Sequence, residues 1–361
     1  MHHAGIRFVL LLAAAWWATP AAAQTSGRER LWEIEGYGGL MRGVGGGGGT
    51  VALPEPGAPI ATSSPIFPSR RVPTWLVGDG AALLNAVNDQ FGVVARLQPL
   101  DPALDGSGLD RGSIPAAGVR LRRAVGARYA VELSFDVLGG SADLSDDFQA
   151  AVEATRNSFR PAFEGLLSTG PFTDVQVDTA VSTSSGSTRE LAVTGAVVYL
   201  FDPAGGFRPY VTLGGGVIAG TGDGAAVAIE GRYRFRVLGE VPFDETDRLI
   251  VRHEPGTALV GVAGAGIRRD VSDRWGIGID GRVFMGRQAT RVTLDSNPSV
   301  AQGTPADFIE TFAAPAIQFS NNPSTGRESS LGVPGLTGFE AFAGDAFQAR
   351  VLITAGVFVR F

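Results

Sequence analysis

The chain has 361 residues and a formal charge of −6, and all 30 of its basic residues are arginines. The absence of cysteine excludes disulfide bonds and a lipoprotein anchor, and the absence of lysine excludes Schiff-base chemistry. The mildly acidic balance gives no reason to expect a nucleic-acid partner.

The first 23 residues are typical of a secretory signal peptide. Arg7 precedes an apolar run over residues 8–17, Pro20 ends the run, and three alanines before Gln24 form a small-residue cleavage site. A membrane-spanning helix would need about 20 apolar residues, roughly twice the length of this run. We therefore expect residues 24–361 to form the exported protein.

Eight later segments show the two-residue alternation of a β-strand with unlike faces. In residues 128–138, for example, Tyr129, Val131 and Leu133 share one face and Glu132 lies on the other. The segments cover residues 32–41, 115–123, 128–138, 187–201, 207–218, 257–269, 275–287 and 347–361. Each is close to the length of a membrane-spanning strand, about 9–11 residues, or a little longer. The pattern predicts an all-β protein.

The connections between these segments alternate between short and long. Short turns join the second segment to the third, the fourth to the fifth and the sixth to the seventh. The long connections cover residues 42–114, 139–186, 219–256 and 288–345. Short periplasmic turns and long extracellular loops are typical of outer-membrane barrels. We predict an eight-stranded antiparallel transmembrane β-barrel over residues 24–361, with a few short helices in its loops.

The last segment ends the chain on an apolar face that carries Val357, Val359 and Phe361. The opposite face is polar, with Leu352 and Phe358 as exceptions. A terminal strand of this kind suits a position facing lipid. We interpret Val357, Val359 and Phe361 as a C-terminal assembly signal that the barrel-assembly machinery recognises.

Three stretches of the long loops have apolar residues at helical spacing. They are residues 79–91, residues 143–159, where Pro161 should end or kink the helix, and a helix start at Thr304 and Pro305. We expect their apolar stripes to pack over the barrel mouth or on one another. A docking face for a partner is the alternative.

These features resemble the family of small bacterial outer-membrane β-barrel proteins, which includes the barrel domain of outer membrane protein A and the opacity-type porins and adhesins. The resemblance is carried by the signal peptide, the strands at residues 32–41 and 207–216, the hairpin at residues 264–284 and the terminal Phe361. It implies a monomer in the cell outer membrane, in contact with outer-membrane lipid and lipopolysaccharide. The chain departs from outer membrane protein A in its long loops and in ending on the barrel.

If the apolar faces meet lipid, the opposite faces line the lumen. They carry five acids and four arginines: Glu33, Glu35, Arg120, Arg122, Glu132, Asp136, Asp280, Arg282 and Arg350. An eight-stranded barrel is just wide enough to be filled by side chains, and an unpaired buried charge is very costly. We therefore predict a largely plugged lumen of paired charges. The competing hypothesis makes the same residues the lining of a narrow porin-like channel for small solutes.

The remaining motifs predict no catalytic, cofactor or metal site. A lipid-modifying barrel enzyme would need a histidine or an equivalent base, and only His253, expected in a solvated loop, remains after removal of the signal peptide. One histidine without cysteine disfavours zinc. The acids Asp143, Asp146 and Asp147 fit a helix N-terminus better than a calcium loop.

One loop segment alternates strongly. Residues 225–238 place Arg232, Arg234 and Arg236 on one face, and residues 249–253 can pair with this segment to extend the barrel wall above the membrane. Such a row of arginines offers a surface site for lipopolysaccharide phosphates or another polyanion. The alternative is a solvated face balanced by nearby acids, namely Glu230, Glu240, Asp244 and Glu245.

The leading hypothesis is a non-enzymatic outer-membrane barrel with a structural or surface-interaction role. A narrow channel is the first alternative, and a lipid-modifying enzyme is the second. A soluble, lipocalin-like barrel is the rival at the level of the fold, and it would reverse the assignment of every strand face.

Overall fold

A computed structural model describes residues 32–44, 49–60, 68–105, 109–110, 113–184, 186–204, 206–221, 224–237, 241–300, 317–321, 326, 328–332 and 334–361. The predicted signal peptide, the predicted helix start at Thr304 and the residue Glu240 lie outside these described residues.

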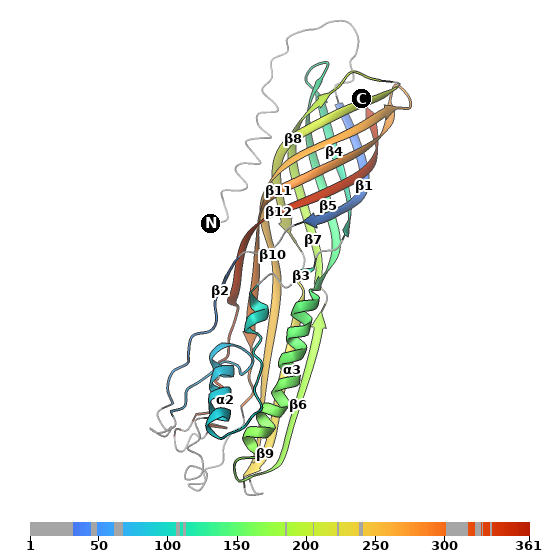
Figure 1. Ribbon diagram of the computed structural model, residues 1–361. Helices are drawn as coiled ribbons and strands as arrows, with labels where there is room; N and C mark the ends of the chain where they lie inside the picture. Colours follow the sequence, from blue (N-terminus) through green and yellow to red (C-terminus); the bar gives the residue numbers. More distant parts are fainter. Residues whose placement is uncertain are drawn as a thin grey trace.

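Eight of the described strands close into an antiparallel barrel, which confirms the prediction of an all-β fold with an eight-stranded antiparallel barrel. Around the barrel they are β11 (Trp275–Ser296), β12 (Phe339–Arg360), β1 (Trp32–Val44), β4 (Ser113–Ala124), β5 (Tyr129–Leu144), β7 (Gly186–Leu200), β8 (Phe207–Gly220) and β10 (Val241–Asp270). The pairing of β10 with β11 completes the ring. The short connections, Trp32 and Phe361 all lie at one end, which we call the turn end (Figure 1).

Three barrel strands continue far beyond the other end of the barrel. β10 has 30 residues, and β11 and β12 have 22 each. Beyond the barrel, β9 (Ala226–Val237) pairs with β10, β6 (Phe172–Ser184) pairs with β9, and β2 (Gly49–Val51) pairs with β12. The short β3 (Leu109–Asp110) pairs with the end of β5.

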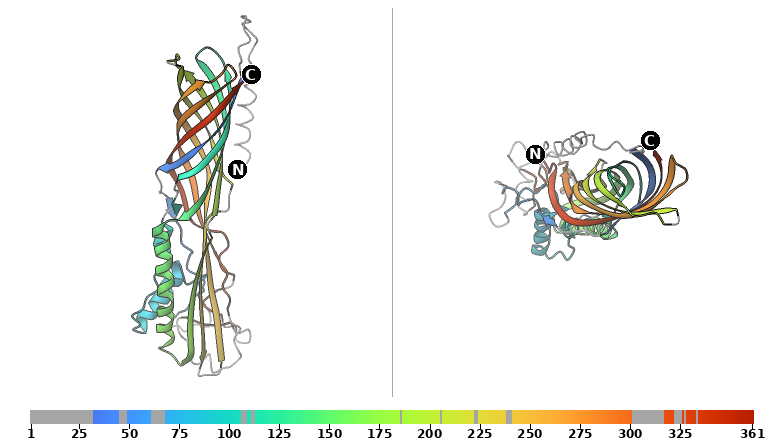
Figure 2. Two further views of the ribbon diagram at one scale, coloured as in Figure 1. Left: turned by 90° about the vertical axis from the view of Figure 1, so that its right-hand side faces the viewer. Right: turned by 90° about the horizontal axis from the view of Figure 1, so that it is seen from above.

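We call this outer sheet, together with its helices, the extension. Figure 2 shows the strands running without a break from the barrel into it. The predicted pairing of residues 225–238 with residues 249–253 is confirmed by the β9–β10 register. Strands therefore occupy parts of the segments at 219–256 and 288–345 that were predicted to be loops.

A β-bulge in β10 separates the barrel from the extension. The register passes from Pro255 opposite Thr290 to Ala258 opposite Gln288, so β10 has one extra residue here. The bulge includes Gly256, where a Cβ atom would lie 2.7 Å from the carbonyl oxygen of Ala289. Because strand faces alternate every residue, the bulge exchanges them. Even-numbered side chains of β10 face inward in the barrel, and odd-numbered ones do so in the extension.

Two helices cover the inner face of the extension. They are α2 (Gly78–Gln90) and α3 (Asp146–Leu167), and a short 3-10 helix, η1 (Asp101–Leu104), packs beside α3. Ser145 caps α3 by accepting a hydrogen bond from the N–H of Phe148, and Asp146 and Asp147 lie in the first turn, as predicted for a helix N-terminus.

Pro161 does not end α3, which was one of the two predicted effects of this proline, the other being a kink. The helix continues for six residues beyond it, to Leu167. In that stretch Ala162, Phe163, Leu166 and Leu167 are all buried. Their packing outweighs the one backbone hydrogen bond that proline cannot donate.

The extension has a hydrophobic core of its own. Trp75 meets Phe163 edge to face at 5.8 Å between ring centroids, and Phe163 stacks on Tyr233 of β9 at 4.5 Å. The loop helices therefore pack on the outer sheet and on each other. Among the described residues, no helix is both long enough and apolar enough to cross a membrane.

Candidate functional site in the barrel interior and the extension

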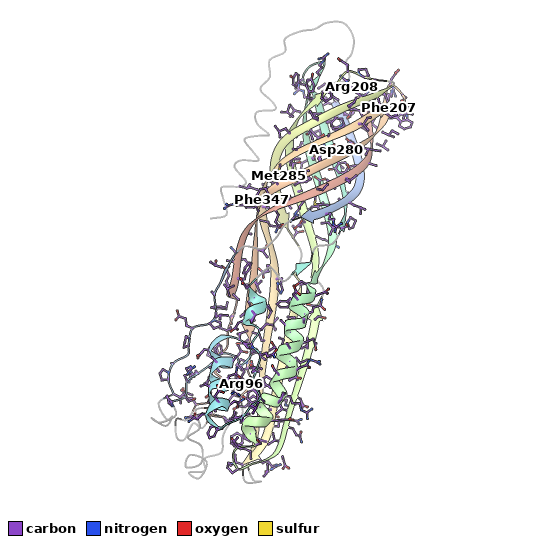
Figure 3. The ribbon with its side chains drawn as sticks, in the orientation of Figure 1. Arg96, Phe207, Arg208, Asp280, Met285 and Phe347 are labelled. Atoms are coloured by element: carbon purple, nitrogen blue, oxygen red, sulfur yellow. The ribbon has the colours of Figure 1, made fainter. Side chains whose placement is uncertain are left out.

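The barrel interior gathers the charged side chains that alternation assigns to the inward faces. All nine predicted lumen residues are buried, with at most 7% of any of them exposed. Asp280, which is labelled in Figure 3, lies in the wall of the barrel proper. Arg350 lies in a second cluster, closer to the extension.

Arg122 of β4 is one centre of this network. Its guanidinium lies 2.5 Å from Glu132, 3.2 Å from Glu35 and 3.3 Å from Glu33. The acids come from the neighbouring strands β1 and β5, whose register places them beside Arg122. One arginine therefore neutralises three carboxylates in part, and its planar group with five N–H donors suits this task.

Arg282 of β11 is the second centre. It lies 2.6 Å from Glu132 and 2.6 Å from Asp280, and Arg120 reaches Asp280 at 3.1 Å. In the ring of eight strands, β11 and β5 are four strands apart in either direction. The Arg282–Glu132 pair therefore crosses the whole lumen.

Two tyrosines complete the hydrogen bonding of the inward acids. Tyr37 donates a hydrogen bond to Asp136, and the Arg120 guanidinium lies 3.8 Å from the centroid of the Tyr37 ring. Tyr210 donates to Asp280 at 2.7 Å. Asp136 is thus held mainly by a phenol, whereas the other acids contact arginines.

Three charged members of the interior escaped the sequence prediction. Arg268 and Arg360 both pair with Glu33, and Glu190 pairs with Arg350. The inward faces around Arg268 and Glu190 are otherwise mostly glycine and apolar residues, so alternation of polar and apolar positions gives no signal there. Only Arg360 could have been found by counting in twos along its strand, from Arg350, because no inward residue was predicted on β7 or β10.

Among the described residues, the inward charges named above are balanced. The five predicted acids plus Glu190 make six, and the four predicted arginines plus Arg268 and Arg360 make six. Arg350 on β12 and Glu190 on β7 are again four strands apart, so this pair also crosses the lumen. Gln288 donates a hydrogen bond to Glu190 at 3.2 Å and closes this second cluster.

An apolar cluster also fills part of the interior, and the sequence analysis did not predict it. It contains Met41, Leu138, Ile218, Phe284 and Leu352, all buried. Leu352 is one of the two apolar exceptions on the terminal strand. The other, Phe358, lies under Arg268, with 4.0 Å between the guanidinium and the ring centroid. Both exceptions are therefore inward packing residues.

The outward face of the barrel is apolar, and on β10 and β11 it becomes charged toward the extension. In β10, exposed Leu259 follows the charged Arg252 and Glu254 of the extension. Leu259 lies opposite Arg287 of β11, which lies opposite Phe347 of β12. Figure 3 shows Met285 and Phe347 where the barrel meets the extension, and Phe207 at the turn end.

The residues of the predicted C-terminal assembly signal lie on this apolar outer face. Val357, Val359 and Phe361 are all exposed on β12 or directly after it. β12 is paired on both sides, with β1 and with β11. Their side chains are therefore presented outward while the strand itself is fully part of the wall.

The arginine row of β9 is exposed, and each of its members has an acidic neighbour. Arg232 pairs with Asp244, Arg234 pairs with Asp178 at 2.9 Å, and Arg236 lies 3.4 Å from Asp174. This is the balanced surface that the sequence analysis weighed against a polyanion site, with Asp174 and Asp178 as additional acids. The expectation that Glu245 shares this surface is wrong, because Glu245 lies on the opposite, buried face of β10.

Glu245 and Asp247 are two fully buried acids that fasten loops to the outer sheet. Glu245 accepts hydrogen bonds from the Tyr233 hydroxyl at 2.7 Å and the Ser320 N–H at 2.5 Å. Asp247 accepts from the Trp75 N–H at 2.6 Å and the Thr74 hydroxyl at 2.8 Å. Burial raises the pKa of Asp247 to about 7, although these hydrogen bonds oppose the rise.

The expectation that His253 is a solvated loop residue is also wrong. It is a fully buried residue of β10, and its ring meets Phe148 of α3 edge to face at 4.8 Å. The bulge beyond it turns this odd-numbered position inward. Within the described part of the chain, no group of three or more histidine, cysteine or acidic side chains is placed to hold a metal ion.

The charge network predicts a large effect of a single neutral substitution. Glu132→Gln leaves Arg122 and Arg282 without their shared carboxylate, and we expect it to lower the free energy of unfolding by about 3 kcal/mol. Urea unfolding of the protein in detergent micelles measures this. Asp202→Asn is the matched control, because Asp202 pairs with Arg128 at an exposed turn and should have little influence. Equal stabilities of the two variants would contradict a structural role of the network.

The buried carboxyl of Asp247 predicts that the extension is more stable in acid. Its pKa lies near 3.8 when exposed and near 7 when buried, so its destabilising ionisation sets in as pH rises between these values. Glu245 and the neutral Tyr233 are the titratable groups beside it. We expect amide exchange around Trp75, corrected for its intrinsic rate, to be faster at pH 8 than at pH 5. Asp247→Asn should remove most of this difference, and an unchanged difference would refute the assignment.

Comparison of the chain with protein-family models and with curated protein sequences identifies no relative. The predicted resemblance to small outer-membrane barrel proteins is therefore neither supported nor opposed by these comparisons, and function has to be argued from the geometry.

Proposed function

We propose that this protein is an outer-membrane β-barrel whose lumen is plugged and whose role is structural or in surface interaction, carried by the extension. The barrel would span the membrane, with the turn end in the periplasm and the extension outside the cell. The enzyme alternative has less support, since the buried acids and His253 hold loops and helices in the core of the extension.

The observation that carries the proposal is the change in outward chemistry along β10 and β11. On β11 the outward face is apolar over residues 275–285, and from Arg287 onward it carries Arg287, Arg291 and Asp295. An apolar stretch of this length matches the roughly 9–11 residues that a tilted strand needs to cross a bilayer. A barrel in water would have no reason to confine its charges to one end of the same strand face.

The aromatic residues at the turn end support the same placement. Tyr129, Phe201, Phe207, Trp275 and Phe361 are exposed there. Aromatic side chains gather where a membrane meets water, because their rings are apolar and their edges tolerate polar headgroups. The apolar band is therefore bordered by aromatic residues at one end and by charged residues at the other.

The contents of the lumen favour a plug over a channel. Ion pairs cross the lumen between opposite walls at Arg282–Glu132 and at Arg350–Glu190. The apolar cluster around Phe284 fills a further part of the interior. A conducting pathway would have to break several of these contacts, and buried charges separated from their partners are strongly destabilising.

The cysteine-free sequence allows a direct test of the membrane position. Ile279 and Arg252 both face outward, but Ile279 lies in the apolar band and Arg252 in the extension. With single cysteines at these positions, we expect a membrane-impermeant maleimide to label Arg252→Cys on intact cells and to spare Ile279→Cys. Both should be labelled after denaturation. Equal labelling of the folded variants in membranes would refute the proposal.

The plugged lumen predicts that the barrel does not conduct ions. We expect the purified protein, inserted in a planar bilayer at high salt, to give no stable single-channel steps. Insertion is verified separately by protection of Ile279→Cys from the maleimide. Reproducible steps from inserted protein would overturn the plug and favour the narrow channel.

A further inference from the structure

At two places in the sequence, two consecutive arginines have side chains on opposite sides of the barrel wall, one inside and one outside. Arg122 and Arg123 lie one residue before the end of β4, and Arg268 and Arg269 lie one residue before the end of β10. Because neighbouring residues of a strand face opposite ways, one arginine of each pair joins the interior network. Arg122 and Arg268 both reach Glu33 there. The other arginine of each pair faces outward at the turn end.

Each outward arginine stacks on an aromatic ring of the neighbouring strand. Arg123 lies directly opposite Trp32 of β1, with 5.3 Å from its guanidinium carbon to the ring centroid. Arg269 lies opposite Phe207 of β8 at 5.1 Å. A stacked guanidinium keeps its N–H donors free at the edge of the plane, where they can bind phosphate in bidentate fashion.

The two stacked arginines differ from other arginines of the same rim. Arg128 pairs with Asp202 at 2.7 Å, and Arg360 pairs with Asp270 at 2.6 Å. No carboxylate of the described residues pairs with Arg123 or Arg269, and both border the apolar outer face. The β1–β4 and β8–β10 seams are also half a turn apart in the ring of eight strands. The rim therefore carries two equivalent cationic sites on opposite sides.

We propose that Arg123 with Trp32, and Arg269 with Phe207, are two binding sites for the phosphate of an anionic phospholipid. The guanidinium would hold the phosphate, and the acyl chains would lie along the apolar outer face. An anionic headgroup fits better than a zwitterionic one, because each site offers one positive charge that no acid of the described residues pairs with. This inference rests on the proposed membrane position of the barrel, and it names the lipid class that the turn end selects.

Native mass spectrometry of the purified protein, released from mixed micelles, tests the two sites. With phosphatidylglycerol and phosphatidylcholine in equal amounts, we expect up to two phosphatidylglycerol molecules to remain bound. Arg123→Gln and Arg269→Gln should each weaken one binding event about five-fold, as expected for about 1 kcal/mol per arginine near a lipid surface. The double variant should lose the preference for phosphatidylglycerol. Arg128→Gln is the matched control and should keep both sites.

Each contrary outcome has a distinct meaning. Equal retention of the two lipids, or an unchanged preference in the double variant, would overturn the inference. Inorganic phosphate that displaces the lipid at millimolar concentration, where sulfate does not, would assign the sites to a soluble phosphate instead. The membrane proposal is tested separately by labelling at position 279, so a barrel that inserts without lipid preference would refute only the two sites.

Discussion

A charge inside a closed eight-stranded barrel has no bulk water around it, so its partner must be another side chain. Here that constraint leads to six acids, six arginines and two tyrosines that hold one another. Two of the ion pairs span the lumen and join strands that lie four apart in the ring, β11 with β5 and β12 with β7. They act as cross-links across the lumen, in addition to the backbone hydrogen bonds between adjacent strands. The network that satisfies the buried charges is therefore also the structure that fills the lumen.

The second constraint is the choice of which residues of β10 face inward. One extra residue at the bulge beside Gly256 exchanges the two faces of the strand, so that even-numbered residues face inward in the barrel and odd-numbered residues do so in the extension. Without it, Glu245, Asp247 and His253 would be exposed, and the Arg248–Arg252 face would turn into the core of the extension. The bulge thus allows one continuous strand to line a charged lumen at one end and an apolar core at the other.

Much of this architecture was predictable from the sequence, because strand alternation and turn length are local signals. They gave all eight barrel strands, the β9–β10 pairing and nine inward charges. The failures share one cause, which is dependence on contacts distant in sequence. Arg268 and Glu190 have inward faces without alternation, His253 faces inward only because of the bulge, and α3 passes Pro161 because the core favours its last turns. None of these facts can be read from a window of ten residues.

The continuity of the long strands bears on how the extension can act. A binding surface carried on flexible loops loses conformational entropy when it orders against a partner. The outer face of the extension is instead carried by β9 and β10, and β10 is hydrogen-bonded to β11 from the turn end to Ser296. Glu245 and Asp247 fasten the intervening loops to the same sheet. The exposed, charge-balanced face of β6, β9 and β10 is therefore held in a fixed orientation relative to the barrel. A rigid, hydrated face of this kind suits recognition of a partner by shape and by matched charges rather than by apolar burial.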